Sequence, residues 1–359
     1  MIPFELQRLG TIMTPEPGNA LETEGVLNPA VTRGPDGRLY LFPRLVAKNN
    51  YSRIGIARVR FDQAGEPIDV ERLGIALEPE ETYEKRTNGG GGCEDPRVTY
   101  LEPLNEYIMT YTAYGPDGPR VAMARSKDLF KWERLGLVHY LPYEHIDFNG
   151  IDNKDASIFP TEIPSPHGHP SIGMLHRPLF PGTRPEEIVK HAKGREIDIH
   201  KESVWISYYN LGQDTTMQYA KFTSNHRLAY PVETWEKLKI GAGAPPVLTQ
   251  HGWMVIYHGV HELKGSTASK VKLCYSAGVM ILSKENPQKI LYRSPKPILV
   301  PELPEETIGT IGNVVFPTGT DRRDDIGQPN RIDVYYGMAD DRIGVAKMQI
   351  PDSLPGINS

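Results

Sequence analysis

The chain has 359 residues, enough for one large β domain or two smaller ones, and its 39% hydrophobic and 24% charged residues are typical of a soluble globular protein. A net charge of -5 gives no reason to expect a nucleic acid or an anionic membrane as a partner. No apolar run approaches the ~20 residues of a membrane-spanning helix, and residues 1–6 lack the basic and apolar regions of a secretory signal. Two cysteines, Cys93 and Cys274, are too few for a disulfide framework and lack zinc-site spacing, so we expect a cytoplasmic protein without a metal ion or other cofactor.

One order of motifs recurs along the chain. Each copy opens with a short motif on its first strand. Two further strand-like segments follow, and then a linking fourth strand such as residues 132–135. The copies begin near residues 28, 95, 155, 245 and 313. The strand-like segments are 38–44 and 52–59, 107–114 and 119–124, 172–177 and 204–209, 252–259 and 271–276, and 332–337 and 342–346.

Five similar units of this kind are the pattern of a β-propeller, which usually has about four to eight blades. The copies recur about every 60 to 90 residues, longer than a WD40 or kelch blade. Two unrelated β domains would not produce one motif order five times. We therefore predict an all-β chain that folds as one five-bladed β-propeller domain over residues 1–359, with a funnel-shaped active site at its centre.

A charged insertion, residues 181–201, interrupts the third copy and contains a short helix-like segment near residues 185–191. It is a candidate lid or subunit contact, which leaves a homo-oligomer open. A solvated loop is the interpretation we favour for it.

The first motif of each copy should face the central channel, because the innermost strands of a propeller converge there. Its polar residues are Asn28, Asp95, Asp155 and Asn313. Asx turns that close each blade account for the two asparagines, whereas two carboxylates directed into one funnel repel each other unless a ligand binds between them. Four glycines at residues 89–92 precede Asp95, and Pro96 should hold Asp95 in an extended conformation.

The funnel combines aromatic and cationic side chains. Tyrosines suit the apolar faces of a sugar; they are Tyr40, Tyr111, Tyr114, Tyr208, Tyr257 and Tyr335. The cations on inner or second strands are Arg53, Arg120, Lys154, His176, Arg177 and His258. Inverting hydrolysis needs an acid and a base, but cations around one convincing acid fit an anionic nucleophile, so the pattern favours phosphorolysis. Pairing with nearby acids at the surface is the alternative for Arg97, Arg125 and Arg134.

Several motifs resemble glycoside hydrolase family 130. They are Glu94-Asp95-Pro96-Arg97, Tyr111-Thr112-Ala113-Tyr114, Ala124-Arg125-Ser126-Lys127-Asp128-Leu129, Asn153-Lys154-Asp155-Ala156, Leu175-His176-Arg177-Pro178 and Tyr336-Gly337-Met338-Ala339-Asp340. The resemblance runs from about residue 28 to 348. It implies a five-bladed propeller that cleaves β-mannosides with inorganic phosphate as co-substrate, with inversion, releasing α-mannose 1-phosphate without a metal.

The resemblance also implies roles for individual residues. Asp95 would be the general acid and would pass its proton through the 3-hydroxyl of mannose. The implied phosphate ligands are Arg53, Arg120, Lys154, His176 and Tyr257. The implied substrate contacts are Asn49, Arg97, Tyr114, Asp155 and Asp340.

Two other functions stay open at this point. One is a β-mannoside hydrolase of the same fold, similar to five-bladed arabinanases, with Asp95 and Asp155 as acid and base. The other is a carbohydrate-binding propeller without catalysis. The linkage cleaved, β-1,2 or β-1,4, and the acceptor, a manno-oligosaccharide or glucose, are likewise open.

Overall fold

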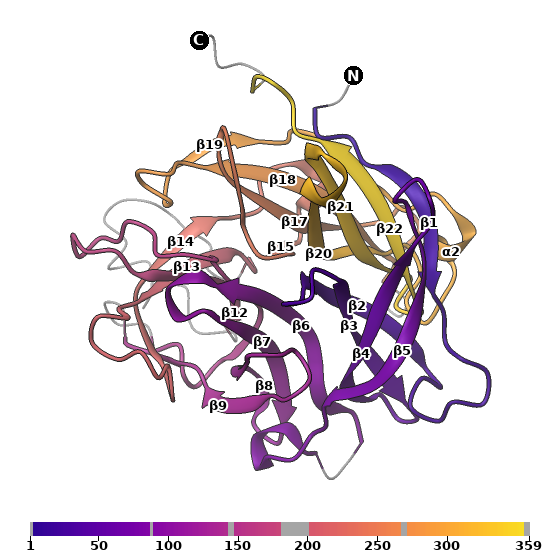
Figure 1. Cartoon of the computed structure of the whole chain (residues 1–359), viewed down its shortest axis with the longest axis horizontal. Coiled ribbons are helices and arrows are strands. Elements are labelled where there is room, and N and C mark those ends of the chain that lie inside the picture. Colours follow the sequence, from indigo (N-terminus) through magenta and orange to yellow (C-terminus); the bar gives the residue numbers. More distant parts are fainter. Residues whose placement is uncertain (1–2, 87–88, 143–146, 181–200, 267–270, 355–359) are drawn as a thin grey trace.

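The computed structural model describes residues 3–86, 89–142, 147–180, 201–266 and 271–354, and it is built almost entirely of strands (Figure 1). Helical structure in these ranges is limited to α2 (Pro304–Thr307) and the short 3₁₀ turns η1 (Thr82–Glu84), η2 (Glu102–Leu104), η3 (Thr234–Glu236) and η4 (Asp324–Ile326). The predicted all-β class is confirmed. The helix predicted near residues 185–191 lies outside the described residues, as does the charged insertion apart from Lys201.

The twenty-two strands of the described residues pair mainly antiparallel in four hydrogen-bonded sheets. The largest sheet, of eight strands, consists of two groups joined by a short parallel pairing of residues 51–52 with residues 91–92, so that the strands form five groups. The first group contains β2 (Gly25–Arg33), β3 (Leu39–Ala47), β4 (Tyr51–Phe61) and β5 (Pro67–Leu77). The second contains β6 (Gly91–Leu101), β7 (Glu106–Gly115), β8 (Gly118–Ser126) and β9 (Glu133–Leu137). The third contains β11 (Asp152–Ile158), β12 (Ile172–Leu179), β13 (Val204–Tyr209), β14 (Lys221–Ala229) and the short β10 (His139–Tyr140).

The last two groups show how the chain is closed. In the fourth group β15 (Lys239–Ala242) and β16 (Val247–Thr249) both pair with β17 (Gly252–Glu262), followed by β18 (Leu273–Leu282) and β19 (Ile290–Arg293). The fifth contains β20 (Val315–Arg323), β21 (Gln328–Met338), β22 (Arg342–Gln349) and β1 (Gln7–Met13). Figure 1 shows the indigo β1 beside the yellow β22, where Gln7 is opposite Lys347. A strand from the beginning of the chain therefore completes the last group.

Hydrophobic side chains fill the seams between neighbouring groups. There are five clusters of buried residues, and each combines side chains from two groups that follow each other in the chain order, with the fifth group packed on the first. Tyr335 of β21, for example, packs with Leu41 of β3 and Val59 of β4. Burial of apolar surface in these five seams is the main force that holds the groups around the middle of the molecule.

Three buried glutamates reinforce these seams. Glu84, Glu236 and Glu306 are each fully buried in a short turn between two groups. Each accepts a hydroxyl hydrogen bond from a tyrosine of a second strand, an arginine bond from an outer strand and backbone N–H bonds from its own turn. The tyrosine bonds are Tyr111 to Glu84 (2.6 Å), Tyr257 to Glu236 (2.9 Å) and Tyr336 to Glu306 (3.0 Å). The arginine bonds are Arg134 to Glu84 (2.9 Å), Arg293 to Glu236 (2.6 Å) and Arg8 to Glu306 (2.8 Å).

The inner strands bulge at their polar residues. Asn28, Asp95 and Asp155 have φ angles of 45°, 46° and 55°, and in each case the strand register shifts there. Asn313, just before β20, has φ 63°. The prediction that Pro96 holds Asp95 extended is therefore wrong. Asparagine and aspartate tolerate left-handed backbone better than other non-glycine residues, and a bulge re-aims the side chain it carries.

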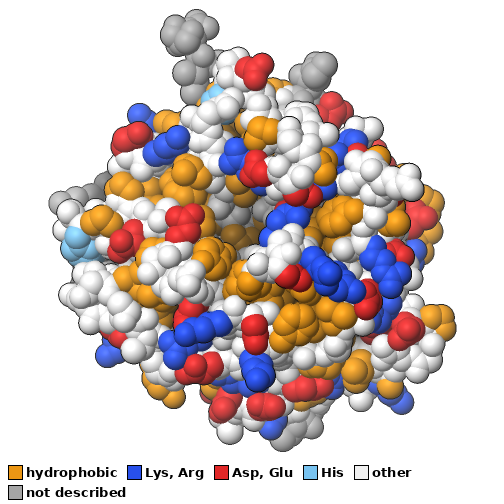
Figure 2. Space-filling model, in the orientation of Figure 1, with side chains coloured by type: hydrophobic (Ala, Val, Ile, Leu, Met, Phe, Trp, Pro, Cys, Tyr) orange, Lys and Arg blue, Asp and Glu red, His pale blue; other side chains and the backbone are white. Residues whose placement is uncertain are grey.

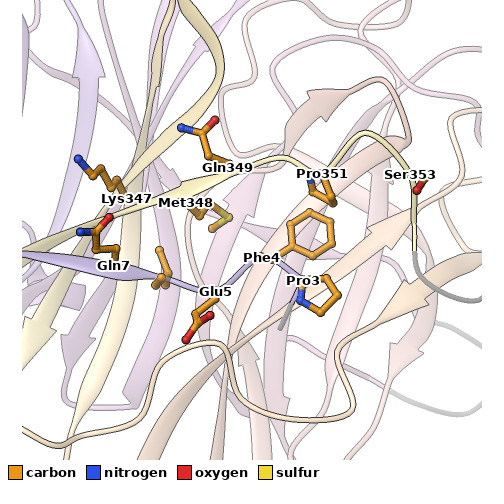
Figure 3. A pocket seen from close by; sticks show the side chains of 10 residues that line it. Pro3, Phe4, Glu5, Gln7, Lys347, Met348, Gln349, Pro351 and Ser353 are labelled. Carbon is orange, nitrogen blue, oxygen red and sulfur yellow. The ribbon is translucent and has the colours of Figure 1, made fainter. Parts of the chain in front are cut away.

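A pocket of about 700 Å³ lies where the two ends of the described chain meet (Figure 3). Phe4 projects into this region between Pro3 and Pro351, and its ring contacts Tyr292 with centroids 5.5 Å apart. None of the residues predicted to act in catalysis lines this pocket. The two cysteines are buried and unpaired, and no helix of the described residues could span a membrane.

The hydrogen bonds of the buried glutamates predict that two tyrosine-to-phenylalanine substitutions differ in their effect on stability. Tyr257→Phe removes the hydroxyl bond to Glu236 and leaves a buried carboxylate with one donor fewer, so we expect a loss of about 1–3 kcal/mol in the free energy of unfolding. Tyr335 is equally buried, but its hydroxyl has no hydrogen-bond partner among the described residues. Tyr335→Phe should therefore leave stability unchanged or raise it. Urea unfolding of both variants makes the comparison, and equal losses would contradict the role given to Glu236.

Candidate active site

Arg44 of β3 connects the first two strand groups at the candidate site. Its guanidinium donates to the Asp95 carboxylate (Nη1 to Oδ1, 3.2 Å) and to the Glu94 carboxylate (Nη2 to Oε1, 2.8 Å). Asn28 donates a third bond from its side-chain amide to Asp95 Oδ1, at 2.9 Å. The surface in Figure 2 is hollowed near the middle of the face shown, with Lys and Arg side chains beside the hollow. The sequence indicated Asn28 and Asp95 for this place but gave no sign of Arg44.

The glycines before Asp95 allow this close approach. Gly91 and Gly92 pair with the start of β4, and both have positive φ angles. A Cβ on Gly92 would lie 2.0 Å from the carbonyl oxygen of Ser52, and one on Gly91 would lie 2.3 Å from that of Tyr114. Any side chain there would push β6 away from its neighbours. The glycines thus serve close packing around Asp95.

The charges around Asp95 keep it ionised. Burial alone would raise the pKa of Asp95, but Arg44, Arg97, the Asn28 bond and Lys154 together hold that pKa below its ordinary value. Burial raises the pKa of Glu94 instead, and the neighbouring Asp95 adds to the rise. A general acid must carry a proton, so the ionised Asp95 is not yet protonated for that role in the unliganded protein.

Three of the predicted substrate contacts lie in loops around Asp95. Asp340 follows β21 with φ 50°, and burial, opposed by Arg44 and assisted by the nearby carboxylates, raises its pKa to about 6. Asn49 lies in the β3–β4 turn, where its carbonyl accepts the Gly90 N–H at 2.7 Å. Tyr114 at the end of β7 stacks under the Arg86 guanidinium, 4.6 Å from the ring centroid.

Asp155 of β11 is the centre of a second, more cationic cluster. Its Oδ2 accepts a 2.6 Å bond from Arg177 Nε and lies 3.6 Å from His258 Nε2. Although burial would raise the pKa of Asp155, Arg177 and the other cations hold it far below its usual range. Arg177 also contacts Glu202 through Nη1, and Lys239 lies 5.5 Å from the ring centroid of Tyr275.

This second cluster carries more positive charge than its acids balance. Burial and the nearby Arg177 lower the pKa of Lys239 to about 8, and burial lowers that of His258 to about 3. Neither ring nitrogen of His258 has a hydrogen-bond partner among the described residues. Lys154, next to Asp155, likewise makes no hydrogen bond or ion pair with the described part of the chain. The two lysines, Lys154 and Lys239, would gain from a bound anion, whereas the imidazole of His258 is neutral.

Arg97 is a buried residue close enough to both the Asp95 and the Asp155 carboxylates to feel their charge. It is 1% exposed, and its guanidinium donates to the backbone oxygens of Gly243 (2.6 Å) and Asp95 (3.0 Å). Burial lowers the pKa of Arg97, while Asp155 and Asp95 oppose that change. In Arg97, a predicted substrate contact, Nε and Nη1 are therefore bound to backbone oxygens, and Nη2 has no hydrogen-bond partner among the described residues. The bond to the Asp95 carbonyl fixes the bulge that aims Asp95.

The structure does not bring the five predicted phosphate ligands together. Only Lys154 lies in the cluster just described. His176 is buried, with Nε2 at 2.8 Å from Ser207 Oγ and Nδ1 beside Asn153, and burial lowers its pKa to about 3. Tyr257 bonds Glu236 in a seam.

The two predicted arginine ligands are both in ion pairs. Arg53 donates through Nε to Glu78 at 2.9 Å, and Arg120 donates through Nη1 to Asp152 at 2.9 Å. Of the arginines assigned to surface pairing, Arg125 does pair with the exposed Glu133. Arg134 instead bonds the buried Glu84.

The match to known proteins is extensive. A family model described as β-1,4-mannooligosaccharide phosphorylase matches residues 7–354. The chain belongs to glycoside hydrolase family 130. A family 130 relative from Thermoanaerobacter, a 1,2-β-oligomannan phosphorylase, is 30% identical over 97% of this chain and 99% of its own. A β-1,4-mannooligosaccharide phosphorylase from Ruminococcus albus is 28% identical over 83% of this chain and 75% of its own.

Solved structures of family 130 share the fold. The β-1,2-mannobiose phosphorylase of Listeria innocua, solved with β-1,2-mannobiose, superposes with a TM-score of 0.67 at 22% identity, covering 96% of this chain and 97% of that one. A family 130 structure reported with glycoside hydrolases that target β-1,2 linkages in Candida mannan gives a TM-score of 0.69 at 20% identity, with 99% and 97% coverage. Within the described residues, no three His, Cys, Asp or Glu side chains are grouped so that they could hold a metal ion.

The raised pKa of Asp340 predicts a pH-dependent gain in stability for Asp340→Asn. The folded carboxyl titrates near 6 and the unfolded one near about 3.9, so the charged form costs stability above pH 6 and the cost fades toward pH 4. We expect the variant to be more stable by about 1–3 kcal/mol at pH 8, with the gain shrinking as the pH falls.

Asp341→Asn is the matched control in the same turn. Asp341 accepts a 2.9 Å bond from Arg342, so its replacement should not stabilise the protein. Urea unfolding at several pH values measures both variants. If Asp340→Asn changes the free energy of unfolding by the same amount at every pH, the ionised Asp340 carboxylate does not destabilise the folded protein.

Proposed function

We propose that this protein is an inverting β-mannoside phosphorylase, which transfers a terminal mannosyl group to inorganic phosphate and releases α-mannose 1-phosphate reversibly. The observation that carries the proposal is the surplus of positive charge around Tyr275, made by Lys154, Arg177 and Lys239 close to Asp155. Family membership and the phosphorylase names of the relatives support it. We propose further that the five strand groups are the blades of a single five-bladed propeller in the cytoplasm.

In this proposal phosphate binds at Lys154 and Lys239, the two cations of the cluster whose side chains remain partly exposed. Arg177 in the same cluster supplies further positive charge, and the neutral imidazole of His258 can supply a further donor. Phosphate needs such donors rather than a base, because it is already anionic. The Asp155 carboxylate is buried and bound by Arg177, which argues against its acting as a base that activates water.

Phosphate binding would also prepare the acid. Lys154 is one of the charges that keep the pKa of Asp95 low. A phosphate beside Lys154 cancels that charge and adds a negative one, and both effects raise the pKa of Asp95. Asp95 then takes up a proton and can deliver it to the leaving sugar oxygen. In this order of events Asp95 is protonated only when phosphate is bound, and this suppresses hydrolysis of the substrate by water.

The role of Asp95 is tested by Asp95→Asn. The amide keeps the shape and can accept the Asn28 and Arg44 bonds, but it has no proton to deliver. We expect kcat to fall about 10²–10⁴-fold, because general acid catalysis is worth that much. A melting curve of the variant serves as the control for folding. Turnover close to that of the wild type would remove Asp95 from the mechanism.

The role of phosphate is tested by Lys154→Ala. Loss of one charge-assisted bond, worth about 1.5–3 kcal/mol, should raise KM for phosphate about 10–100-fold and change β-mannoside binding little. Lys127→Ala is the control, because Lys127 is 82% exposed and pairs with Glu106. Products are identified by NMR with β-1,2- and β-1,4-mannosides. Release of free mannose at the same rate with and without phosphate would make the protein a hydrolase.

A further inference from the structure

Glu202 is a carboxylate at the edge of the cationic cluster around Asp155. It lies shortly before β13, and its side chain forms an ion pair with Arg177 through Oε2 and Nη1. The Glu202 side chain is 25% exposed, whereas the side chains of Arg177 and Asp155 are 6% and 1% exposed. Of the two carboxylates that contact the Arg177 guanidinium, Glu202 is therefore the one that an incoming ligand can reach.

The backbone fixes Glu202 between the third and fourth strand groups. Its carbonyl accepts the N–H of Ile240 in β15 at 3.1 Å, one residue after Lys239. Its side chain contacts Arg177 of β12, in the third group. Glu202 thus joins the Arg177 guanidinium to the strand that carries Lys239, one of the two lysines proposed to bind phosphate.

The neighbouring cations offer donors only. Lysine and arginine side chains have no acceptor atom, so Lys154, Lys239 and Arg177 present N–H groups alone. The Asp155 oxygen in this cluster already accepts the Arg177 Nε–H at 2.6 Å, and Asp155 is buried. Glu202 therefore adds a reachable, ionised acceptor to a site that otherwise suits an anion.

An acceptor in an anion site is unfavourable unless the anion carries a proton. Near pH 8 inorganic phosphate is mainly a dianion that keeps one P–OH group. That group can donate to the Glu202 carboxylate while the other oxygens accept from Arg177 and the lysines. Sulfate has the same charge and shape but no proton, so one of its oxygens would face the Glu202 carboxylate without a hydrogen bond between them.

We propose that Glu202 is a specificity-determining residue, which accepts a hydrogen bond from the P–OH group of phosphate and excludes sulfate. The inference rests on the proposed phosphorolysis and adds to it the selection of the nucleophile. Arg177 has a second role in this assignment, because its ion pair keeps Glu202 ionised and in place to accept. The selection depends on the proton of the anion and not on its charge, since both ions are dianions.

The test compares phosphate and sulfate in the wild type and in Glu202→Gln at pH 8. KM for phosphate is measured in β-mannoside phosphorolysis, together with Ki for sulfate as a competitor of phosphate. A site built to bind a hydroxyl rejects an analogue without it by up to about 10⁴–10⁵-fold, and exposure of Glu202 reduces this factor. We therefore expect Ki for sulfate to exceed KM for phosphate by about 100-fold or more in the wild type.

In Glu202→Gln the ratio of Ki for sulfate to KM for phosphate should fall about 10–100-fold, the effect of one hydrogen bond to a charged group. The amide can turn its N–H₂ group toward sulfate. Glu202→Ala removes the acceptor without adding a donor, and it should lower the ratio as well. Melting curves of both variants measure whether the fold is kept.

Glu133→Gln is the matched control, because Glu133 also pairs with an arginine, Arg125, but lies on the outer strand β9. It should leave the ratio unchanged. Arsenate serves as a control for size, since it is larger than phosphate but also keeps a proton at pH 8. In the wild type arsenate should compete with phosphate far better than sulfate does.

Three results overturn the inference. The first is competition by sulfate in the wild type that is as strong as competition by arsenate. The second is that KM for phosphate and Ki for sulfate change by the same factor, or not at all, in Glu202→Gln and Glu202→Ala, since Glu202 then does not distinguish the ions. The third is phosphate-independent release of mannose that is lost in Glu202→Gln, since Glu202 is then the base of a hydrolase.

Calorimetric titration with phosphate and with sulfate, in the absence of sugar, separates this inference from the proposed function. If no β-mannoside is phosphorolysed, the proposed function fails, and the two affinities alone decide the role of Glu202. Tighter binding of phosphate than of sulfate in the wild type, lost in Glu202→Gln, supports the inference. Equal affinities in the wild type, or no binding of either ion, overturn it.

Discussion

A buried glutamate fixes how neighbouring strand groups align at three of the five apolar seams. Glu84, Glu236 and Glu306 are carboxylates without solvent contact, and a buried charge is tolerated only when donors surround it. Each glutamate collects donors from its own turn, from a second strand and from an outer strand. Because those donors come from separate elements, the charge is satisfied only when the elements are in register.

The same seams position the candidate site. The turn that contains Glu84 leads directly to Gly91 and Gly92, which place β6 against β4 and so bring Asp95 to Arg44. The left-handed bulge then aims the carboxylate, and Arg97 secures the bulge through the Asp95 carbonyl. The fold and the candidate site are coupled here, since the residues that close the seam also determine where the Asp95 carboxylate lies.

The sequence predicted the strands and the inner polar residues because both recur in the same order along the chain. Segments 107–114 and 204–209 are strands β7 and β13, and Asn28, Asp95 and Asp155 do occupy equivalent bulges. The five predicted phosphate ligands are not brought together in the folded chain, because a strand position does not tell which side a polar residue faces. Tyr257 faces a seam and donates a hydrogen bond to Glu236. The sequence does mark the three buried glutamates, because a proline precedes each of them by five residues, at Pro79, Pro231 and Pro301. Arg44 left no mark, because its role depends on two strands that meet only in the folded chain.

The pairing of β1 with β22 has a consequence for how the protein is made. Arg8 and Glu306, which bond across this group, are 298 residues apart. During synthesis β1 leaves the ribosome long before β22 and stays without this pairing partner until residues 342–349 have been made. Contacts of such long sequence separation are slow to form, and an unpaired strand edge is a template for association with other chains. Chaperone protection of the nascent N-terminal segment would therefore matter more for the yield of this protein than for one whose sheets are built from neighbouring strands alone.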